Sequence, residues 1–419
     1  GCARSSCRDE GVIANPLRCL YGCGCFKEKK MVNTNKNEIT VNGRVYHAPK
    51  APTVVICIDG SEPGYIEKAI EAGLAPNMAR FMKSGANLIA ECVIPSFTNP
   101  NNLSIITGRP PEVHGIAGNF FYDPSTGTEV MMNDPKFMRA PTILAGVHDA
   151  GFKVAMVTAK DKLRLLLSNG LDYSSGRAIA FSSEKADKAN KAENGIDHVT
   201  DFVGMGVPDV YSAELSEFVF AAGVKLVETF KPDLMYLSTT DYIQHKAAPG
   251  SQIANDFYAM IDRYVSQLDA LGCVIVATAD HGMNDKHHAD HSPNVLYLEP
   301  LFDEWVGAGN ARVILPITDP YVVHHGALGS FATIYIPQEA SAGELIKRLK
   351  SVEGVERAMT KQEACEAKHD LSGLTEPLRS HGGLTEQRVP MISNKTMTPP
   401  AGHRLRTFDV FTAALNWTH

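Results

Sequence analysis

Four short apolar runs, each followed at once by polar or charged residues, constrain the fold of this chain more than any other feature of its sequence. The runs are VVICIDG (54–60), FKVAMVTAKD (152–161), DLMYLSTTDY (233–242) and CVIVATADHG (273–282). Continuous apolar runs are typical of strands that are buried on both faces, and helical segments such as PNMARFMKSG (76–85) lie between them. The sequence therefore predicts an α/β fold with a mostly parallel central sheet and helices on both faces.

The polar residues that end these runs predict where a ligand binds. Asp59, Lys160, Asp241 and Asp280 each follow an apolar run directly. The carboxyl ends of parallel strands meet at one edge of a sheet, and ligands bind outside that edge. We therefore expect these four side chains to belong to one site.

Composition excludes several classes of function. The chain has 419 residues, 44% of them hydrophobic and 21% charged, which is ordinary for a globular protein. Its net charge of -7 gives no basic surface for nucleic acid, so no nucleic-acid partner is expected. No apolar run approaches the roughly 18 residues of a membrane span, so no membrane association is expected. A small-molecule substrate is the predicted partner, and a homodimer is left open.

The cysteines divide the chain into two parts. Five of the nine lie within the first 25 residues, in a segment that begins without Met, and Met31 resembles a natural start. We expect residues 1–30 to be a non-native or disordered extension. A cysteine-rich metal or disulfide module is the alternative. The other four cysteines are scattered, which favours a reducing compartment and predicts a cytoplasmic protein.

A change of pattern near residue 300 predicts a second structural unit. Residues 301–370 contain two strand-like segments, a charged helical segment SAGELIKRLKSV (341–352) and a third strand-like segment VERAMT (355–360). We predict a small α+β cap over 301–370 that is inserted into the core. The predicted core comprises residues 31–300 and 371–419.

Carboxylates and imidazoles gather in the strand-end motifs and in the SHGG motif after the predicted cap. In TTDYIQH, Asp241 and His245 are four residues apart, so a helical turn would project both to one side. Such a group would repel itself unless divalent cations neutralised it, and mixed Asp and His ligands favour zinc, with Mn²⁺ or Fe²⁺ as substitutes. Two ions about 4 Å apart are the arrangement that clamps a phosphoryl group. The six candidate ligands are Asp59, Asp241, His245, Asp280, His281 and His381.

Each of these residues also has a simpler interpretation. Asp59 before Gly60 is compatible with an ordinary turn, and Asp280 beside His281 with a hydrogen-bonded imidazole. The remaining histidines are predicted to lie outside the site. We expect His287, His288 and His291 at the surface, and His324 and His325 in structural positions or near the mouth of the site.

Thr98 stands at the start of a predicted helix, in SFTNPNNLSIITG (96–108). Its hydroxyl could act as a nucleophile if a divalent cation stabilised the alkoxide, and the positive end of the helix would favour an anionic substrate. Alternatively, Thr98 could only cap the helix. The local sequence does not decide between the two.

Together these motifs resemble the alkaline phosphatase superfamily. The resemblance rests on Asp59, on SFTNPNNLSIITGRPPEVHGIAGN (96–119), DYIQH (241–245), ADHGM (279–283) and His381, and it covers nearly all of residues 50–419. The nucleotide pyrophosphatase/phosphodiesterase branch and the phosphonoacetate hydrolases have the same order of elements. Cofactor-independent phosphoglycerate mutases, in contrast, have a serine nucleophile.

The resemblance implies a role for each candidate residue. It implies one zinc ion held by Asp241, His245 and His381, and a second held by Asp59, Asp280, His281 and the nucleophile Thr98. Asn119 matches the residue that hydrogen-bonds a non-bridging oxygen of the substrate. Phosphonoacetate hydrolases have lysines at the positions of Lys160 and Lys162, where they bind the substrate carboxylate. Substrate contacts are thus expected from Thr98, Asn119, Lys160, Lys162 and His245.

The leading hypothesis is therefore zinc-dependent hydrolysis of the carbon–phosphorus bond of phosphonoacetate to acetate and phosphate, through a phosphothreonine, in phosphonate catabolism. Lys160 and Lys162 would point to the same side of an extended segment, although surface lysines are often merely solvated. A phosphodiesterase, nucleotide pyrophosphatase or phosphonate monoester hydrolase with the same two metals is the alternative. A catalytically silent zinc-binding protein on this fold is the third hypothesis.

Overall fold

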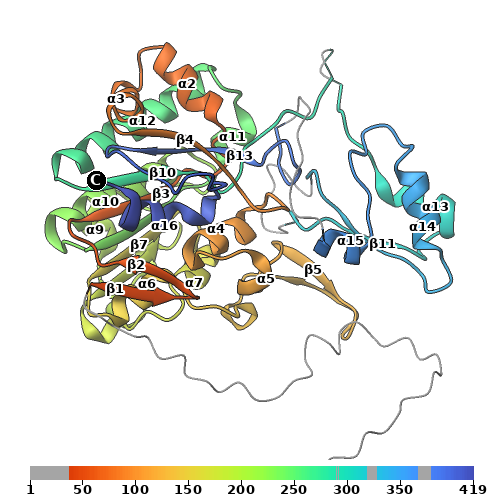
Figure 1. The fold of residues 1–419 in the computed structure, drawn as a ribbon, viewed down its shortest axis with the longest axis horizontal. Coiled ribbons are helices and arrows are strands. Elements are labelled where there is room, and N and C mark those ends of the chain that lie inside the picture. Colours follow the sequence, from red (N-terminus) through yellow and green to blue (C-terminus); the bar gives the residue numbers. More distant parts are fainter. Residues whose placement is uncertain (1–36, 289, 291, 319–327, 367–378) are drawn as a thin grey trace, which may run out of the picture.

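The computed structural model describes residues 37–288, 290, 292–318, 328–366 and 379–419. The predicted extension, residues 1–30, lies outside these residues, as do His291, His324 and His325. A seven-stranded sheet forms the centre of the fold (Figure 1). In spatial order its strands are β4 (Ala86–Glu91), β13 (Arg388–Ser393), β10 (Val274–Thr278), β3 (Thr53–Cys57), β9 (Leu234–Ser238), β7 (Val154–Thr158) and β8 (Ala178–Ser182).

The sheet is mostly parallel, as the apolar runs predicted. The strands from β10 to β8 all pair in parallel, and β13 is antiparallel to both β10 and β4. The mixed, mostly parallel sheet with covering helices confirms the predicted fold class. It also places the carboxyl ends of β10, β3 and β9 side by side.

Helices cover both faces of the sheet because its strands are apolar on both sides. In β3, Val54 and Ile56 belong to one hydrophobic core, and Val55 and Cys57 belong to the other. The first core is covered by α2 (Pro63–Glu71), α3 (Pro76–Ser84), α9 (Val199–Val203), α10 (Glu214–Thr229) and α12 (Gln252–Ala270). The second is covered by α4 (Thr98–Thr107), α6 (Ile143–Asp149), α7 (Asp161–Leu167) and α16 (Val410–Thr412).

Shorter elements complete this part of the chain. Two antiparallel hairpins pair β1 (Glu38–Val41) with β2 (Arg44–His47), and β5 (Phe120–Asp123) with β6 (Thr128–Met131). The short helices are α5 (Pro111–His114), α8 (Lys191–Asn194) and α11 (Tyr242–Lys246).

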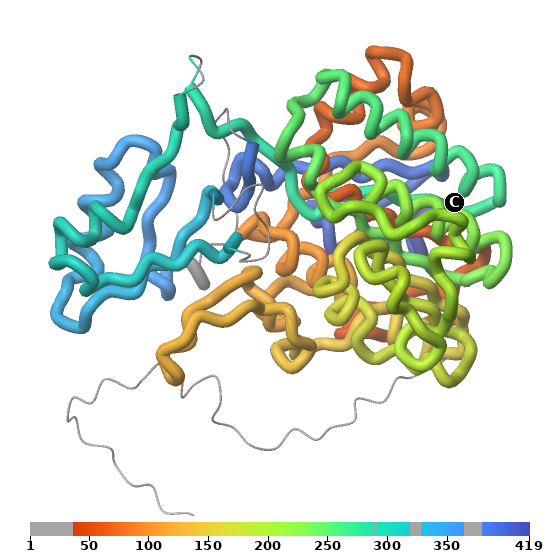
Figure 2. Tube along the Cα trace, turned by 180° about the vertical axis from the view of Figure 1, so that it is seen from behind, coloured from red at the N-terminus to blue at the C-terminus, as the bar shows by residue number. Residues whose placement is uncertain are grey.

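A smaller α+β unit lies beside the sheet, at the right of Figure 1, and Figure 2 shows the same separation from behind. It has its own apolar cluster, which includes Phe302, Leu345 and Leu349. Its elements are α13 (Leu298–Val306), β11 (Arg312–Ile314), β12 (Thr333–Tyr335), α14 (Ala342–Leu349) and α15 (Lys361–Glu366). The predicted cap boundaries at 301 and 370 stay a prediction.

One element predicted for this unit was wrong. Residues 355–360 form no strand in the structure. In the described part of the unit, β11 and β12 pair only with each other, so this segment has no partner strand to provide a ladder of hydrogen bonds.

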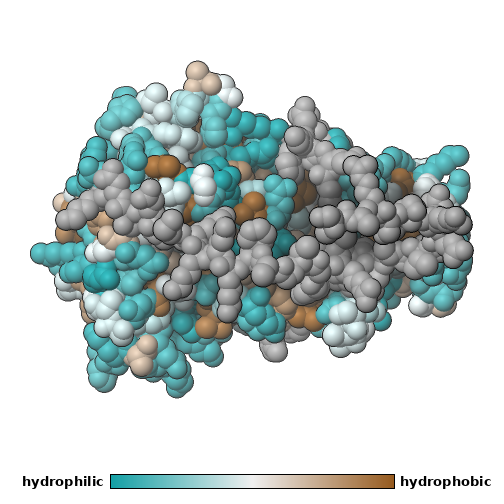
Figure 3. All heavy atoms as spheres, turned by 60° about the horizontal axis from the view of Figure 1, so that its bottom comes forward, coloured by the Kyte–Doolittle hydropathy of each residue, from teal (hydrophilic) through white to brown (hydrophobic). Residues whose placement is uncertain are grey.

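The surface agrees with the ordinary composition of the chain. On the face in Figure 3, hydrophilic residues predominate over the described part and hydrophobic residues are scattered among them. None of the helices that the structure describes has both the length and the apolar character needed to cross a membrane.

Candidate active site

Three aspartates meet at the carboxyl edge of the sheet because they follow three neighbouring strands. Asp59 follows β3 and Asp280 follows β10, while Asp241 follows β9 at the N-cap position of α11. Gly60 allows their close approach. Its φ is +71°, and a Cβ atom there would lie 3.0 Å from the Cβ of Asp241.

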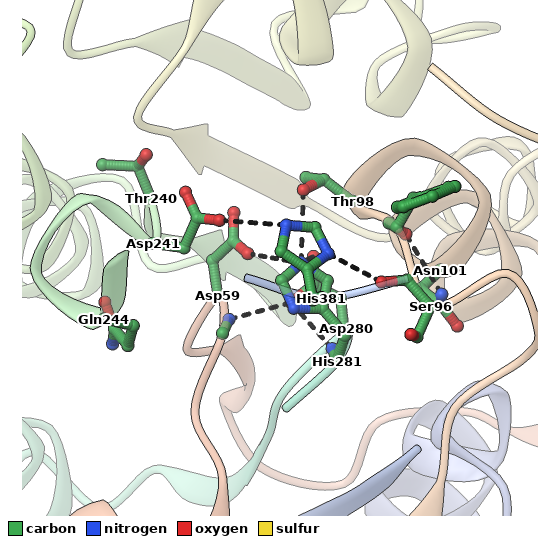
Figure 4. A network of polar contacts seen from close by, with 12 residues as sticks. Asp59, Ser96, Thr98, Asn101, Thr240, Asp241, Gln244, Asp280, His281 and His381 are labelled. Atoms are coloured by element: carbon green, nitrogen blue, oxygen red, sulfur yellow. Dashed lines mark hydrogen bonds and ion pairs between the residues drawn. The ribbon is translucent and has the colours of Figure 1, made fainter. Parts of the chain in front are cut away.

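Histidines join the aspartates in one buried network (Figure 4). His281 Nε2 lies 3.2 Å from Asp59 Oδ1, and its ring stacks on that of His381 with 3.6 Å between the ring centroids. Asp241 Oδ2 lies 2.9 Å from His245 Nε2 and 3.5 Å from His381 Nε2. The predicted helical turn that would bring Asp241 and His245 together is therefore present.

All three imidazoles present the same nitrogen to the network. Their Nδ1 atoms lie 3.0, 2.9 and 2.7 Å from the carbonyl oxygens of Arg379, Gly282 and Ser96, for His245, His281 and His381 respectively. A carbonyl oxygen only accepts hydrogen bonds, so each Nδ1 carries a hydrogen. In the neutral ring, the lone pair on Nε2 then points toward the carboxylates.

Burial and neighbouring charges shift the pKa values of Asp59 and Asp241 in opposite directions. Burial raises the pKa of Asp59 well above its usual value, and the charges of Asp241 and Asp280 add to the rise, whereas Lys160 opposes it. Burial alone would also raise the pKa of Asp241, but its interactions with His245 and His381 hold it well below the usual value. Carboxylates this close cannot all be ionised at low cost without a cation between them.

These residues fit a metal site. Asp59 Oδ1 is a buried oxygen with no hydrogen-bond partner in the described structure. Two groups, Asp59–Asp280–His281 and Asp241–His281–His381, bring one possible ligand atom from each residue within 4.8 Å of the others. Buried carboxylate oxygens and imidazole Nε2 atoms are the donors that zinc and similar divalent ions prefer. His281 belongs to both groups, whereas the resemblance assigned it to one ion only.

Thr98 lies against this network and does not cap α4 through its side chain. The N-cap position is occupied by Phe97, and no side-chain cap hydrogen bond is present. The Thr98 hydroxyl lies 3.3 Å from His281 Nε2 instead. Of the two readings of Thr98 that the sequence left open, the geometry supports the one in which the hydroxyl belongs to the site.

Lys160 and Lys162 reach the same pocket as Thr98. Their segment is not extended as predicted, because Lys160 is the N-cap of α7 and Lys162 lies in its first turn. Both side chains nevertheless line the pocket, as do Asp59 and His381. Burial and the neighbouring charge of Lys160 lower the pKa of Lys162 to about 7.

Asn119 also lines the pocket. Its side-chain oxygen accepts a hydrogen bond of 3.1 Å from the backbone N–H of Asn99, the residue after Thr98. The amide nitrogen of Asn119 is therefore the atom that can donate to a bound anion, and one of its two hydrogens reaches the carbonyl oxygen of Ile317 at 3.4 Å.

Seven of the ten predicted site residues line one pocket: Asp59, Thr98, Asn119, Lys160, Lys162, Asp241 and His381. His245, Asp280 and His281 do not line it but contact the network, and His245 belongs to neither metal-binding group. The roles of all ten residues stay predictions. His287 is half-buried and His288 is exposed, and neither belongs to the metal-binding groups found among the described residues. Sequence reasoning missed several residues that line the pocket. Thr158, Thr239 and Thr240 lie at the polar strand ends and could have been noticed there, whereas no sequence pattern pointed to Met131, Leu163 and Ile317.

The chain resembles solved structures of a bacterial enzyme over most of its length. The phosphonoacetate hydrolase of Sinorhizobium meliloti 1021, in complex with phosphonoacetate, has 56% sequence identity and a TM-score of 0.85. The match covers 91% of this chain and 100% of that chain, and the same values hold for the complex with phosphonoformate. Alkaline phosphatase PafA, with 14% identity and a TM-score of 0.63 over 88% of this chain and 96% of that chain, shows the fold alone.

More distant relatives match shorter stretches. A pyrophosphatase/phosphodiesterase of Schizosaccharomyces pombe, described as uncharacterized, is 34% identical over 96 residues. Ectonucleotide pyrophosphatase/phosphodiesterase family member 1 of Mus musculus is 29% identical over 120 residues. These matches cover 22% and 28% of this chain, but only 19% and 13% of the two relatives.

The family match is broader. Residues 53–370 match the family described as type I phosphodiesterase / nucleotide pyrophosphatase. Together with the 56% identical structures, this match confirms the resemblance inferred from the motifs. The chain belongs to the type I phosphodiesterase / nucleotide pyrophosphatase family, within the alkaline phosphatase superfamily.

Proposed function

We propose that this protein is a phosphonoacetate hydrolase, which converts phosphonoacetate and water to acetate and phosphate. The observation that carries the proposal is that Lys160 and Lys162 line the same pocket as Thr98 and the carboxylate–imidazole network. Phosphonoacetate has an anionic group at each end, and the pocket offers a place for each. The 56% identical enzyme of Sinorhizobium meliloti supports the proposal.

The lining of the pocket argues against a nucleotide substrate. A nucleotide phosphodiesterase needs an apolar or aromatic surface for the base. Among the described residues, no aromatic side chain apart from the imidazole of His381 lines the pocket, and its apolar members are Met131, Leu163 and Ile317. The family also contains phosphodiesterases, so activity on diesters is the alternative that the experiment must measure.

Two zinc ions are the cofactor that we propose, with Mn²⁺ or Fe²⁺ as substitutes. When bound, such ions would neutralise the carboxylates, polarise the phosphoryl oxygens as Lewis acids and favour the alkoxide of the threonine nucleophile. The residues that would hold them are Asp59, Thr98, Asp241, His245, Asp280, His281 and His381. His245 is also proposed to contact the substrate.

In the first step, Thr98, the two lysines and Asn119 have separate roles. Thr98 releases its hydroxyl proton to water, and its Oγ1 forms a bond to phosphorus in line with the carbon–phosphorus bond, which breaks. The electron pair passes to the methylene carbon and delocalises into the carboxylate as an enolate. Lys160 and Lys162 hold that carboxylate, and the amide nitrogen of Asn119 donates to a non-bridging oxygen of the phosphoryl group.

The second step returns the enzyme to its starting state. The enolate takes a proton from water at carbon and leaves as acetate. A water molecule then attacks phosphorus, the bond from phosphorus to Thr98 Oγ1 breaks, Oγ1 takes up a proton from that water, and phosphate leaves. Each turnover therefore consumes phosphonoacetate and one water molecule, and releases acetate and phosphate.

Release of acetate and phosphate from phosphonoacetate, with and without a chelator, tests the function. We expect equimolar products that disappear when the metal is removed. Turnover of p-nitrophenyl phosphate diesters is measured in parallel, and Lys160→Ala should impair phosphonoacetate turnover far more than diester turnover. Diester hydrolysis without phosphonoacetate turnover would favour the alternative function. Zinc binding without activity on either substrate would favour a silent zinc-binding protein.

The cellular role is part of the same proposal. We propose that the protein acts on its small-molecule phosphonate in phosphonate catabolism in the cytoplasm. Cys57, Cys92 and Cys273 are buried as free thiols, which is compatible with a reducing compartment. Fractionation of cells in which the protein is produced would test the location.

A further inference from the structure

Asn102 joins three parts of the site although it does not line the pocket. It lies in α4, four residues after Thr98, and is fully buried. Its amide nitrogen donates to Asp280 Oδ2 at 2.8 Å and to the carbonyl oxygen of Thr98 at 3.3 Å. Its side-chain oxygen accepts hydrogen bonds from the hydroxyl groups of Tyr236 at 2.8 Å and Ser238 at 3.0 Å, both on β9.

These four contacts fix the orientation of the amide. An asparagine side chain offers two donor hydrogens on nitrogen and two acceptor sites on oxygen, and here all four are used. A rotation by 180° would place the oxygen against the Asp280 carboxylate and the carbonyl of Thr98, two acceptors, and the nitrogen against two hydroxyl donors. The hydroxyls of Tyr236 and Ser238 therefore hold the donor side of Asn102 toward Asp280.

Asn102 is the hydrogen-bond donor to one of the two carboxylate oxygens of Asp280. Oδ1 accepts from the backbone N–H groups of Gly60 at 3.3 Å and of His281 at 3.1 Å. Oδ2 accepts from Asn102 and lies 3.7 Å from His281 Nε2, where it faces the proposed metal site. The amide thus sets the rotation of a carboxylate that is completely buried.

We infer that Asn102 is a positioning residue, which holds the Asp280 carboxylate and the turn that carries Thr98 in a fixed relation to the metal site. The inference rests on the proposed metal-dependent site but not on the identity of the substrate. Groups that orient a metal ligand in this way contribute about 10–100-fold to metal affinity or activity. The same amide donates to the backbone carbonyl of Thr98 and to Asp280 Oδ2, so it holds both residues in place.

A comparison of two buried asparagines tests the inference. Asn102→Ala removes the donor to Asp280, and Asn194→Ala removes a buried amide whose partners, Asn190 and Ala180, do not line the pocket. Zinc affinity of the metal-free, full-length variants is measured by competition with a chelator, and Tm is measured with and without zinc. We expect Asn102→Ala to bind zinc about 10–100-fold more weakly and to gain less Tm from zinc than the wild type.

The control separates positioning from simple loss of packing. Asn194→Ala should lower Tm without zinc but keep wild-type zinc affinity. Wild-type zinc affinity in Asn102→Ala would overturn the inference. If Asn102→Ala does not fold, the double variant Tyr236→Phe/Ser238→Ala replaces it, since it keeps Asn102 but removes both donors that orient it; wild-type zinc affinity there would equally overturn the inference.

Failure of the proposed function would have a different signature. These measurements use zinc alone and need no turnover. A wild-type protein that binds zinc but does not hydrolyse phosphonoacetate would refute the substrate assignment, whereas the difference in zinc affinity between Asn102→Ala and Asn194→Ala would still decide the role of Asn102.

Discussion

The charge of Lys162 predicts a specific dependence of activity on pH. Burial and the charge of Lys160 lower its pKa to about 7, from 10.5. Lys162 is therefore charged below pH 7 and becomes neutral as the pH rises, so its contribution to carboxylate binding is present at low pH and lost at high pH. At pH 8 about a tenth of the free enzyme keeps this charge, and at pH 9 about a hundredth.

We accordingly expect kcat/KM for phosphonoacetate to fall about tenfold per pH unit above pH 7, because kcat/KM reports the ionisation of the free enzyme. A bound carboxylate stabilises the ammonium ion, so the fall in kcat should begin at a higher pH. Arginine stays charged throughout this range. The Lys162→Arg variant should therefore have a lower maximum kcat/KM, and its kcat/KM should not fall through deprotonation of residue 162.

Steady-state kinetics between pH 6 and 9 check the prediction, with metal content measured at every pH. Lys160→Arg is the matched control, because it changes the neighbouring cation but leaves Lys162 to titrate. The reasoning would be refuted by an unchanged fall above pH 7 in Lys162→Arg, since the titrating group would then lie elsewhere, for example in the network around Asp59 and His381.

Two further predictions concern the nucleophile and the metal. Thr98→Ala should lower kcat by about 10⁴-fold or more while metal content stays close to wild type. Thr98→Ser should keep measurable turnover because it retains a hydroxyl group. Near-normal acetate release by Thr98→Ala would contradict the assignment of Thr98 as the nucleophile. Removal of metal should lower Tm, because buried Asp59, Asp241 and Asp280 then repel one another. Calorimetry with and without chelator measures the difference, and an unchanged Tm would argue against a metal in this network.

The strand-end aspartates could be predicted from the sequence because local pattern and sheet topology act together there. The apolar runs predicted buried parallel strands, and a parallel sheet brings strand ends together whatever lies between them. Asp59, Asp241 and Asp280 could therefore be placed at one edge before the fold was known. The spacing of Asp241 and His245 was informative for the same reason, since a helical turn has a fixed geometry.

The rest of the site depends on contacts that no local pattern encodes. Ile317 reaches the pocket from the linker that follows β11, and Met131 reaches it from the β5–β6 hairpin, so neither follows an apolar run of the central sheet. Lys160 and Lys162 were predicted on an extended segment, but Lys160 is the N-cap of α7 and Lys162 lies in its first turn, and both line the pocket. The role of Asn102 becomes visible only when Tyr236 and Asp280, from two different strand regions, lie beside it.

The proposed binding of the phosphoryl group at the metal site and of the carboxylate at Lys160 and Lys162 predicts which phosphonates are substrates. Cleavage of phosphonoacetate leaves the electron pair on a carbon next to the carboxylate, where an enolate can form beside Lys160 and Lys162. In phosphonoformate the carboxylate is bonded directly to phosphorus, and in 3-phosphonopropionate it lies one carbon further away, so neither can form this enolate. Both compounds should therefore bind at the two ends of the pocket as competitive inhibitors without releasing phosphate. Phosphate release from 3-phosphonopropionate at a rate close to that of phosphonoacetate would show that the lysines bind the carboxylate without stabilising charge on carbon.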